Sequence, residues 1–383
     1  MALVALDELD VFEEVCADCY RPAREAAAQG RKVAGYMCSY SPQELLHAAG
    51  YYPVRVIGRL GATPRADELL QSFICSFARS TFDAGLSGEF NFLEIMLFAH
   101  TCDTMQNLAD LWQGNCPGMK TIITAMPNLH AGTASTTYFR KELDRVRGCI
   151  EDVAGSITDD QLRASIRLYE QHREAMKSLY ALRRACPEAL SGTQMMSVIL
   201  SSFLMPREQH LALITTLTDK LTSLPAGTAS KRPKVVVGGS VCQAVDFIAA
   251  IEEAGCLVAD DNLCMGRRSY LLPPSPGGDP MDALTQLYLS RDPCPAIHKP
   301  GFDPAVNMLE RVRESRSDGV IFLITKFCDP FGFDYPHINE QLEKAGIPSL
   351  MLEIEQHLPV PEQVRTRMEA FVEILQSKKG NAA

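Results

Sequence analysis

Thirteen cysteines are spread along the 383 residues, and four of them stand where side chains often do chemistry. Cys38, Cys102 and Cys328 each come just after an apolar run with the character of a strand, and Cys75 stands near a predicted helix start. Open α/β proteins bind ligands beyond the carboxyl ends of their strands, and a helix start favours a thiolate. We therefore expect these four thiols to meet in one cleft between two domains.

Soft thiolates without a histidine cluster nearby suit an iron–sulfur cluster or zinc. No C-x2-C…C-x2-C ribbon is present, so structural zinc is the weaker choice. An odd cysteine count in a long chain argues against a disulfide framework, and we expect the other thiols to pack as small buried side chains. Two alternatives stay open, namely a redox role for Cys16 and Cys19 in their C-x2-C, and a metal role for Cys264 beside Asp260 and Asp261.

The elements that position these thiols are predicted from hydrophobic periodicity and from turn residues. Strands are predicted at 32–37, 53–57, 92–99 and 121–125, and then from Lys234, at 256–259, 319–325 and 348–352. Helices are predicted at 42–50, 69–84, 104–112, 244–254, 281–290, 303–316, 331–345 and 361–376. This alternation indicates an α/β protein with two doubly wound parallel-sheet domains, 1–135 and 225–383, joined by a helical region at 136–224 and a linker near 223–233.

Composition excludes several classes of protein. Hydrophobic residues make up 46% and charged residues 22% of the chain, which is ordinary globular usage. The net charge of −10 lacks the basic footprint of a nucleic-acid binder. No apolar run approaches the roughly 20 residues that span a bilayer, and acids stand where a signal peptide carries Lys or Arg. We expect a cytoplasmic protein with neither a nucleic-acid nor a membrane partner.

The glycine-rich turn Gly238-Gly239-Ser240 follows a strand and opens a helix. Free backbone N–H groups at such a turn can hold a phosphate, but a tight structural turn explains it equally well. It matches neither a dinucleotide fingerprint nor a Walker loop. The sequence therefore gives this chain no ATP site of its own.

Six stretches of the chain resemble the family of 2-hydroxyacyl-CoA dehydratases and class I benzoyl-CoA reductases. They are GYMCSYSPQELLHAAGYYPVRV (35–56), ICSFARS (74–80), HTCDTMQNLADLW (100–112), VADDNLCMGRR (258–268), KFCDPFGFDYP (326–336) and EQVRTRMEAFVEIL (362–375). They follow the order of the family from near the start of the chain to near its end, so the resemblance covers nearly the whole sequence.

The resemblance implies two flavodoxin-like domains with an oxygen-sensitive [4Fe–4S] cluster between them. Cysteines matching Cys75, Cys102 and Cys328 are its shared ligands, and Cys38 permits a fourth ligand or a bridged double-cubane cluster. The resemblance also implies an acyl-CoA thioester substrate, a homologous second subunit or a second copy of the chain, and a separate ATP-hydrolysing iron–sulfur activator.

The implied reaction passes through a ketyl radical, and Ser39, His47 and His100 are candidate proton donors by position. A lone histidine is more often a hydrogen-bonded structural residue. The leading expectation is the catalytic subunit of a 2-hydroxyacyl-CoA dehydratase. The alternatives are a ring-reducing benzoyl-CoA reductase subunit, a non-catalytic electron-transfer or scaffold subunit, and a plain α/β binding domain whose cysteines only pack.

Overall fold

The computed structural model describes residues 6–223, 230–240 and 245–382, and within them the chain forms two four-stranded parallel sheets. The first sheet has the order β2-β1-β3-β4, and the second has the order β6-β5-β7-β8. The strands are β1 (Val33–Tyr36), β2 (Tyr52–Arg55), β3 (Ile95–His100), β4 (Lys120–Ala125), β5 (Lys234–Gly239), β6 (Leu257–Asn262), β7 (Gly319–Thr325) and β8 (Ser349–Ile354). Because both orders are of the flavodoxin type, the predicted doubly wound α/β fold is confirmed.

The central strands are buried because helices cover both faces of each sheet. Every residue of β1 and β7 is buried, as the continuous apolar runs VAGY and GVIFLIT require of parallel strands. Within each sheet the chain turns back at a switch point, which lies between β1 and β3 in the first and between β5 and β7 in the second.

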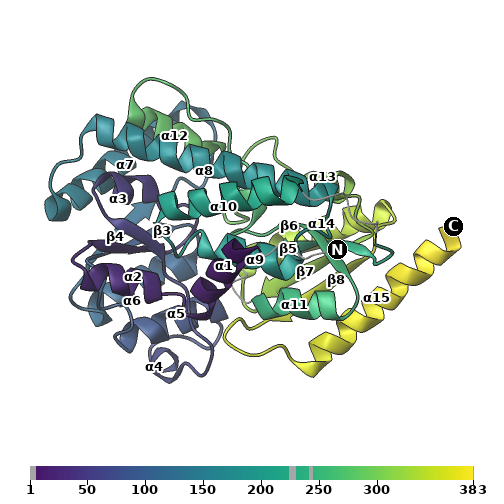
Figure 1. The fold of residues 1–383 in the computed structure, drawn as a ribbon. Helices are drawn as coiled ribbons and strands as arrows, with labels where there is room; N and C mark the ends of the chain where they lie inside the picture. Colours follow the sequence, from purple (N-terminus) through teal and green to yellow (C-terminus); the bar gives the residue numbers. More distant parts are fainter. Residues whose placement is uncertain (1–5, 224–229, 241–244, 383) are drawn as a thin grey trace.

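Helices surround the sheets and also connect them (Figure 1). We call the part of the chain around the first sheet the first lobe and the part around the second sheet the second lobe. The helices of the first lobe are α1 (Asp7–Ala17), α2 (Arg21–Ala28), α3 (Gln43–Ala48), α4 (Pro64–Asp67), α5 (Ser76–Leu86) and α6 (Asp103–Asn115). The connecting helices are α7 (Gly132–Ala154), α8 (Asp159–Ala185), α9 (Gly192–Ser201) and α10 (Arg207–Ser223). Those after the linker are α11 (Val245–Glu253), the 3-10 turn η1 (Arg267–Ser269), α12 (Pro280–Ser290), α13 (Pro304–Ser315), α14 (Asp329–Lys344) and α15 (Glu362–Ala382).

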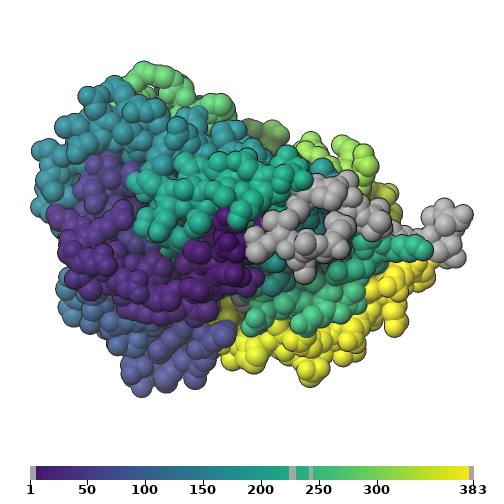
Figure 2. Space-filling model, viewed as in Figure 1, coloured from purple at the N-terminus to yellow at the C-terminus, as the bar shows by residue number. Residues whose placement is uncertain are grey.

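The connecting helices pack on both lobes. Helix α8 begins with a capping box of Thr158 and Gln161 and contacts α3 of the first lobe and β6 of the second. One continuous apolar core includes Leu97 of β3 and Val237 of β5. Figure 2 shows the same layout from outside, with the teal connecting helices lying across the purple and the green parts of the chain.

Two differences from the predicted bounds bear on the site. The helix predicted at 69–84 begins only at Ser76, because Cys75 is extended at φ −59° and ψ 144° and serves as its N-cap. Strand β6 continues through Asp260 and Asp261 instead of ending before them. The two carboxylates tolerate this burial because they bind Arg267 and Tyr180 respectively.

The predicted domain boundary at 224/225 touches residues outside the described part. None of the described helices has the length and apolar character that a membrane span requires.

Candidate functional site

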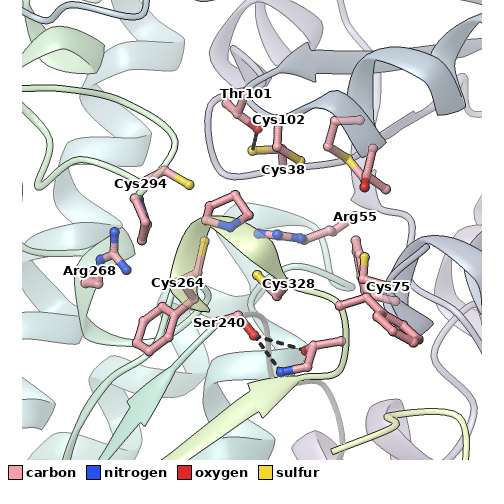
Figure 3. A pocket seen from close by; sticks show the side chains of 18 residues that line it. Cys38, Arg55, Cys75, Thr101, Cys102, Ser240, Cys264, Arg268, Cys294 and Cys328 are labelled. Carbon is pink, nitrogen blue, oxygen red and sulfur yellow. Dashed lines mark hydrogen bonds between the residues drawn. The ribbon is translucent and has the colours of Figure 1, made fainter. Parts of the chain in front are cut away.

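The carboxyl ends of the two sheets face a common cavity that is lined by six cysteines (Figure 3). They are Cys38, Cys75, Cys102, Cys264, Cys294 and Cys328. The space open to the centre of a water molecule is about 110 Å³. In Figure 3 the sulfur atoms surround this space, and the side chain of Arg55 reaches into it. Both topological switch points therefore open onto one site, as the sequence predicted for four of these thiols.

Three of the thiols belong to residues that begin helices. Cys75 is the N-cap of α5, Cys102 the N-cap of α6, and Cys328 the N-cap of α14. The partial positive charge and free N–H groups of a helix start favour negative charge there. We call Cys75, Cys102 and Cys328 the first thiol group. Its members come from both lobes, and each lies at a helix start.

The other three thiols, Cys38, Cys264 and Cys294, form the second thiol group. Cys38 and Cys264 each lie two residues beyond a strand, namely β1 and β6, and Cys294 lies in the loop after α12. Cys38 has a left-handed backbone with φ 74°, and Phe327 beside Cys328 has φ 65°. Such conformations are unfavourable for side chains other than glycine, and they gather at functional sites. Backbone strain is thus present on both sides of the cavity.

Sequence reasoning missed Cys294, and it connected Cys264 with the wrong neighbours. Cys264 follows β6 and therefore obeys the same strand-end rule that singled out Cys38 and Cys102. In the structure Asp260 forms an ion pair with Arg267, and Asp261 accepts a hydrogen bond from Tyr180. Cys264 instead lines the cavity together with the other thiols. No pattern in the sequence marks Cys294, because it lies in a long irregular loop.

The electrostatics of the six thiols set Cys264 apart from the other five, whose pKa values are all raised. Burial, supported by nearby thiols, raises the pKa of Cys75 to about 11 and that of Cys102 to about 12, against backbone N–H groups of the following helical turn. Burial and the neighbouring Cys264 and Cys38 likewise raise the pKa of Cys294. Cys264 differs, because Arg268, Arg55 and a hydrogen bond with Ser39 outweigh its burial and lower its pKa. Positive charge is thus already present for thiolates in the cavity.

The surroundings of Arg55 indicate whether the cavity suits an anionic group. Its side chain is fully buried, its Nη1 donates to Ser39 Oγ at 3.0 Å, and its guanidinium lies 5.3 Å from the centre of the Phe203 ring. Nε and Nη2 have no hydrogen-bond partner among the described residues. An unpaired buried donor is costly unless a ligand accepts from it. Six thiols outside any disulfide and a guanidinium with free donors therefore fit an anionic iron–sulfur cluster.

The predicted proton donors lie at different distances from the thiols. Ser39 Oγ is 3.4 Å from Cys264 Sγ, although Ser39 itself is not among the residues that line the cavity. His47 bonds Ser165 and Glu208 on the outer side of α3, and His100 ends β3 at half-burial. Neither histidine is among the residues that line the cavity. Of the three candidates, the structure brings only Ser39 to the thiols.

The surroundings of the other candidates from the sequence indicate packing roles. Gly239 has φ 141°, and a Cβ there would lie 2.0 Å from the Leu323 carbonyl oxygen, so close strand packing explains the glycine-rich turn. Burial raises the pKa of both Cys16 and Cys19, which disfavours their reactive thiolates. Cys242 lies outside the described residues. Among those described, no three His, Cys, Asp or Glu side chains lie close enough to hold a single metal ion.

These features define a class of protein: a two-lobed, doubly wound α/β protein with a cysteine-lined site between its switch points. The sequence model of the family "2-hydroxyglutaryl-CoA dehydratase, D-component" matches residues 38–375, and the chain belongs to this family. The resemblance seen in the sequence is confirmed, and the chain is an enzyme subunit of the dehydratase and benzoyl-CoA reductase group.

Curated relatives match over nearly their whole length. The chain is 28% identical to the (R)-phenyllactyl-CoA dehydratase beta subunit of Clostridium sporogenes, over 90% of this chain and 92% of the relative. It is 29% identical to a benzoyl-CoA reductase subunit of Thauera aromatica, over 95% of each chain. It is 25% identical to the beta subunit of (R)-2-hydroxyglutaryl-CoA dehydratase of Acidaminococcus fermentans, over 98% of this chain and all of the relative. All three names are those of subunits in enzymes with several components.

Proposed function

We propose that the chain is the iron–sulfur subunit of a low-potential acyl-CoA enzyme that dehydrates a 2-hydroxyacyl-CoA. The observation that carries this proposal is the convergence of Cys75, Cys102 and Cys328, from two lobes, on one cavity. These three residues would hold a [4Fe–4S] cluster, and three protein ligands leave one iron open to another ligand. When bound, such a cluster supplies single electrons that turn a CoA thioester carbonyl into a ketyl radical anion, from which the hydroxyl group can leave.

The protein's own side chains have three tasks in this proposal. Phe77, Met105 and Phe331 line the cavity and exclude water from it. Arg55 and Arg268 bring positive charge to a group that is negative overall. Ser39, held by Arg55 and close to Cys264, is the one of the three predicted donors that could pass a proton toward a cavity thiol. His47 and His100 would act only through intervening groups.

The second thiol group favours a further candidate, a double-cubane cluster. Cys38, Cys264 and Cys294 would supply three ligands to a second cubane beside the first. A chain with both cubanes could serve as an electron-transfer or scaffold subunit, with the reacting iron in a partner chain. The similarity to the benzoyl-CoA reductase of Thauera aromatica also keeps aromatic ring reduction as an alternative reaction.

The proposal includes partners and a location. A homologous second subunit or a second copy of this chain would complete the enzyme, and a separate ATP-hydrolysing iron–sulfur protein would deliver the electron. The acyl-CoA thioester is the proposed substrate, and the cytoplasm is the proposed compartment.

The test is anaerobic purification followed by iron and sulfide analysis of the wild-type chain and three variants. We expect Cys102→Ala and Cys328→Ala to lose most of the iron, because each removes a ligand at a helix start. Cys19→Ala is the control and should keep the wild-type iron content, because Cys19 lies outside the cavity. The complex reconstituted with its activator is then assayed with a 2-hydroxyacyl-CoA and with benzoyl-CoA.

Each outcome has a defined meaning. Iron and sulfide near zero in the wild-type protein would leave only a binding domain with packed cysteines. Equal iron loss in all three variants would contradict the assigned ligands. Turnover of benzoyl-CoA alone would select the reductase, and full cluster content without turnover of either substrate would select the electron-transfer role.

A further inference from the structure

A second, smaller cavity lies beside the thiols, under the helical region. Helices α3, α8, α10 and α12 lie together above the first sheet and enclose it (Figure 1). Tyr36, Arg173, Arg207, Tyr270, Tyr288 and Arg291 are among its lining residues. Ser39 also lines it and bonds Cys264 on its other side, so the two cavities share a wall. We call this space the arginine chamber.

The chamber has more positive than negative charge. Arg173, Arg207 and Arg291 contribute three buried guanidinium groups against one buried carboxylate, Glu44. Glu44 is already engaged, because it accepts from Tyr288 Oη at 2.8 Å and lies 3.6 Å from Arg173 Nη1. Guanidinium groups stay protonated in proteins, so the imbalance persists at neutral pH.

The histidines and tyrosines do not change this imbalance. Burial and nearby guanidinium groups lower the pKa of His172, and burial raises the pKa of Tyr36 and Tyr270. These side chains are therefore neutral near pH 7. Two further carboxylates act on the lining residues: Glu170, near Arg173, is half-buried and accepts from the Ser275 backbone N–H, and Asp261, near Tyr270, accepts from Tyr180 Oη.

Three polar atoms of the lining side chains have no hydrogen-bond partner among the described residues. They are Tyr36 Oη, Arg173 Nη2 and Arg207 Nε. Their residues are 1%, 6% and 6% exposed, so bulk water does not satisfy them. Arg207 is held in place by Gln43, to which Nη2 donates at 2.9 Å, and by the Tyr169 ring at 4.7 Å. Fixed and unpaired donors around a positively charged space call for an anionic acceptor.

We propose that the arginine chamber binds a small oxyanion of carboxylate size, with Arg173, Arg207 and Tyr36 donating to it. The chamber offers about 30 Å³ to the centre of a water molecule, the room of roughly two to three waters. That volume suits formate or another ion of about three heavy atoms. The fork of a guanidinium matches the two oxygens of a carboxylate. The site does not depend on whether iron occupies the neighbouring thiols.

The test is calorimetric titration of the full chain, isolated anaerobically, with sodium formate against sodium chloride at equal ionic strength. We expect formate to bind and to raise the melting temperature beyond the effect of chloride. Tyr36→Phe should weaken formate binding about tenfold, the worth of one hydrogen bond to a charged group. The variant should fold, because the lost hydroxyl has only the Arg207 guanidinium as a weak neighbour, and Arg207 keeps Gln43 and the Tyr169 ring as partners.

Two further variants complete the design. Arg207→Gln should abolish formate binding, and Arg163→Gln, on the exposed part of α8, is the matched control that should bind like the wild type. Formate that behaves like chloride in the wild-type chain would mean that the chamber holds water only and would overturn the proposal. Unchanged formate affinity in Tyr36→Phe would overturn it too. Repeating the titration on iron-free chain separates this result from the cluster proposal, because formate should bind there equally.

Discussion

Cys264 and Cys294 are the residues whose role depends most on the structure. Both line the cavity together with Cys38, and the thiols of Cys264 and Cys294 influence each other electrostatically. The guanidinium groups of Arg268 and Arg55 favour the thiolate of Cys264. A thiolate with compensating cations behaves as a ligand, whereas a thiol buried for packing alone lacks them.

For the double-cubane candidate, we predict that Cys264→Ala and Cys294→Ala each lower the iron content by about half. A double cubane holds roughly eight iron atoms per chain, four in each cubane, and loss of the second thiol group would leave the first. Anaerobic iron analysis of each variant measures this. Cys116→Ala is the matched control, since Cys116 is a buried cysteine outside the cavity. Wild-type iron content in both cavity variants would restrict the site to one cubane.

The strand-end rule explains which site residues the sequence could reveal. Cys38, Cys102 and Cys328 were identifiable because a strand and the loop after it can be read from local residues. The proximity of Cys294 was not, because it depends on how the 13-residue loop between α12 and α13 folds against Tyr40 of the first lobe. Arg55 gives no signal either, since an arginine that ends a short strand normally points to solvent.

At the scale of elements, helices α8 and α10 are joined by a buried histidine pair. His172 Nε2 lies 2.9 Å from His210 Nδ1, and His210 Nε2 bonds the Val198 carbonyl oxygen. Burial and the neighbouring Arg207 lower the pKa of His210 to about 3. The folded state therefore keeps this imidazole neutral over a pH range in which the unfolded chain takes up a proton.

This difference predicts an acid-dependent loss of stability. The unfolded chain binds the extra proton below about pH 6.5, so the free energy of unfolding falls as the pH drops from there toward 3, by up to about 1.4 kcal/mol per pH unit for each such histidine. Urea unfolding of His210→Gln at pH 7 and pH 5 should show a smaller difference between the two pH values than the wild type shows. His298→Gln, at an exposed histidine, should keep the wild-type difference. An unchanged difference in His210→Gln would contradict the assigned protonation.

Strands and helices were largely predictable because burial patterns are local. Strand 319–325 was predicted with its observed bounds, and the helical character of the connecting region was clear from its periodicity. Errors arose where tertiary partners override local preference. Strand β6 runs on through two acidic residues, since Arg267 and Tyr180 compensate them from elsewhere in the chain.

At the scale of the whole molecule, the first thiol group spans both lobes. Cys75 and Cys102 belong to the lobe of the first sheet, and Cys328 follows β7 of the second. A group bound to all three would tie the lobes together, and its binding free energy would add to the free energy of unfolding.

We predict that anaerobic removal of iron lowers the melting temperature of the wild-type chain by several degrees. One kcal/mol corresponds to about 2–4 °C in domains of this size. Differential scanning calorimetry before and after chelation measures the effect. The lowering of the melting temperature by chelation should vanish in Cys328→Ala, which loses the proposed ligand of the second lobe. It should persist in Cys19→Ala. Equal melting temperatures of loaded and chelated wild-type protein would show that no bound group joins the lobes.

The thiols that face the cavity first occur at residue 38 and last at residue 328 of the 383-residue chain. A ribosome makes the first of them long before the last, because about 290 residues separate Cys38 from Cys328. For the proposed cluster, the early thiols would have to stay reduced during this interval, and iron and sulfide would be inserted only after Cys328 has been made. Insertion would thus follow, and not accompany, the synthesis of the first lobe.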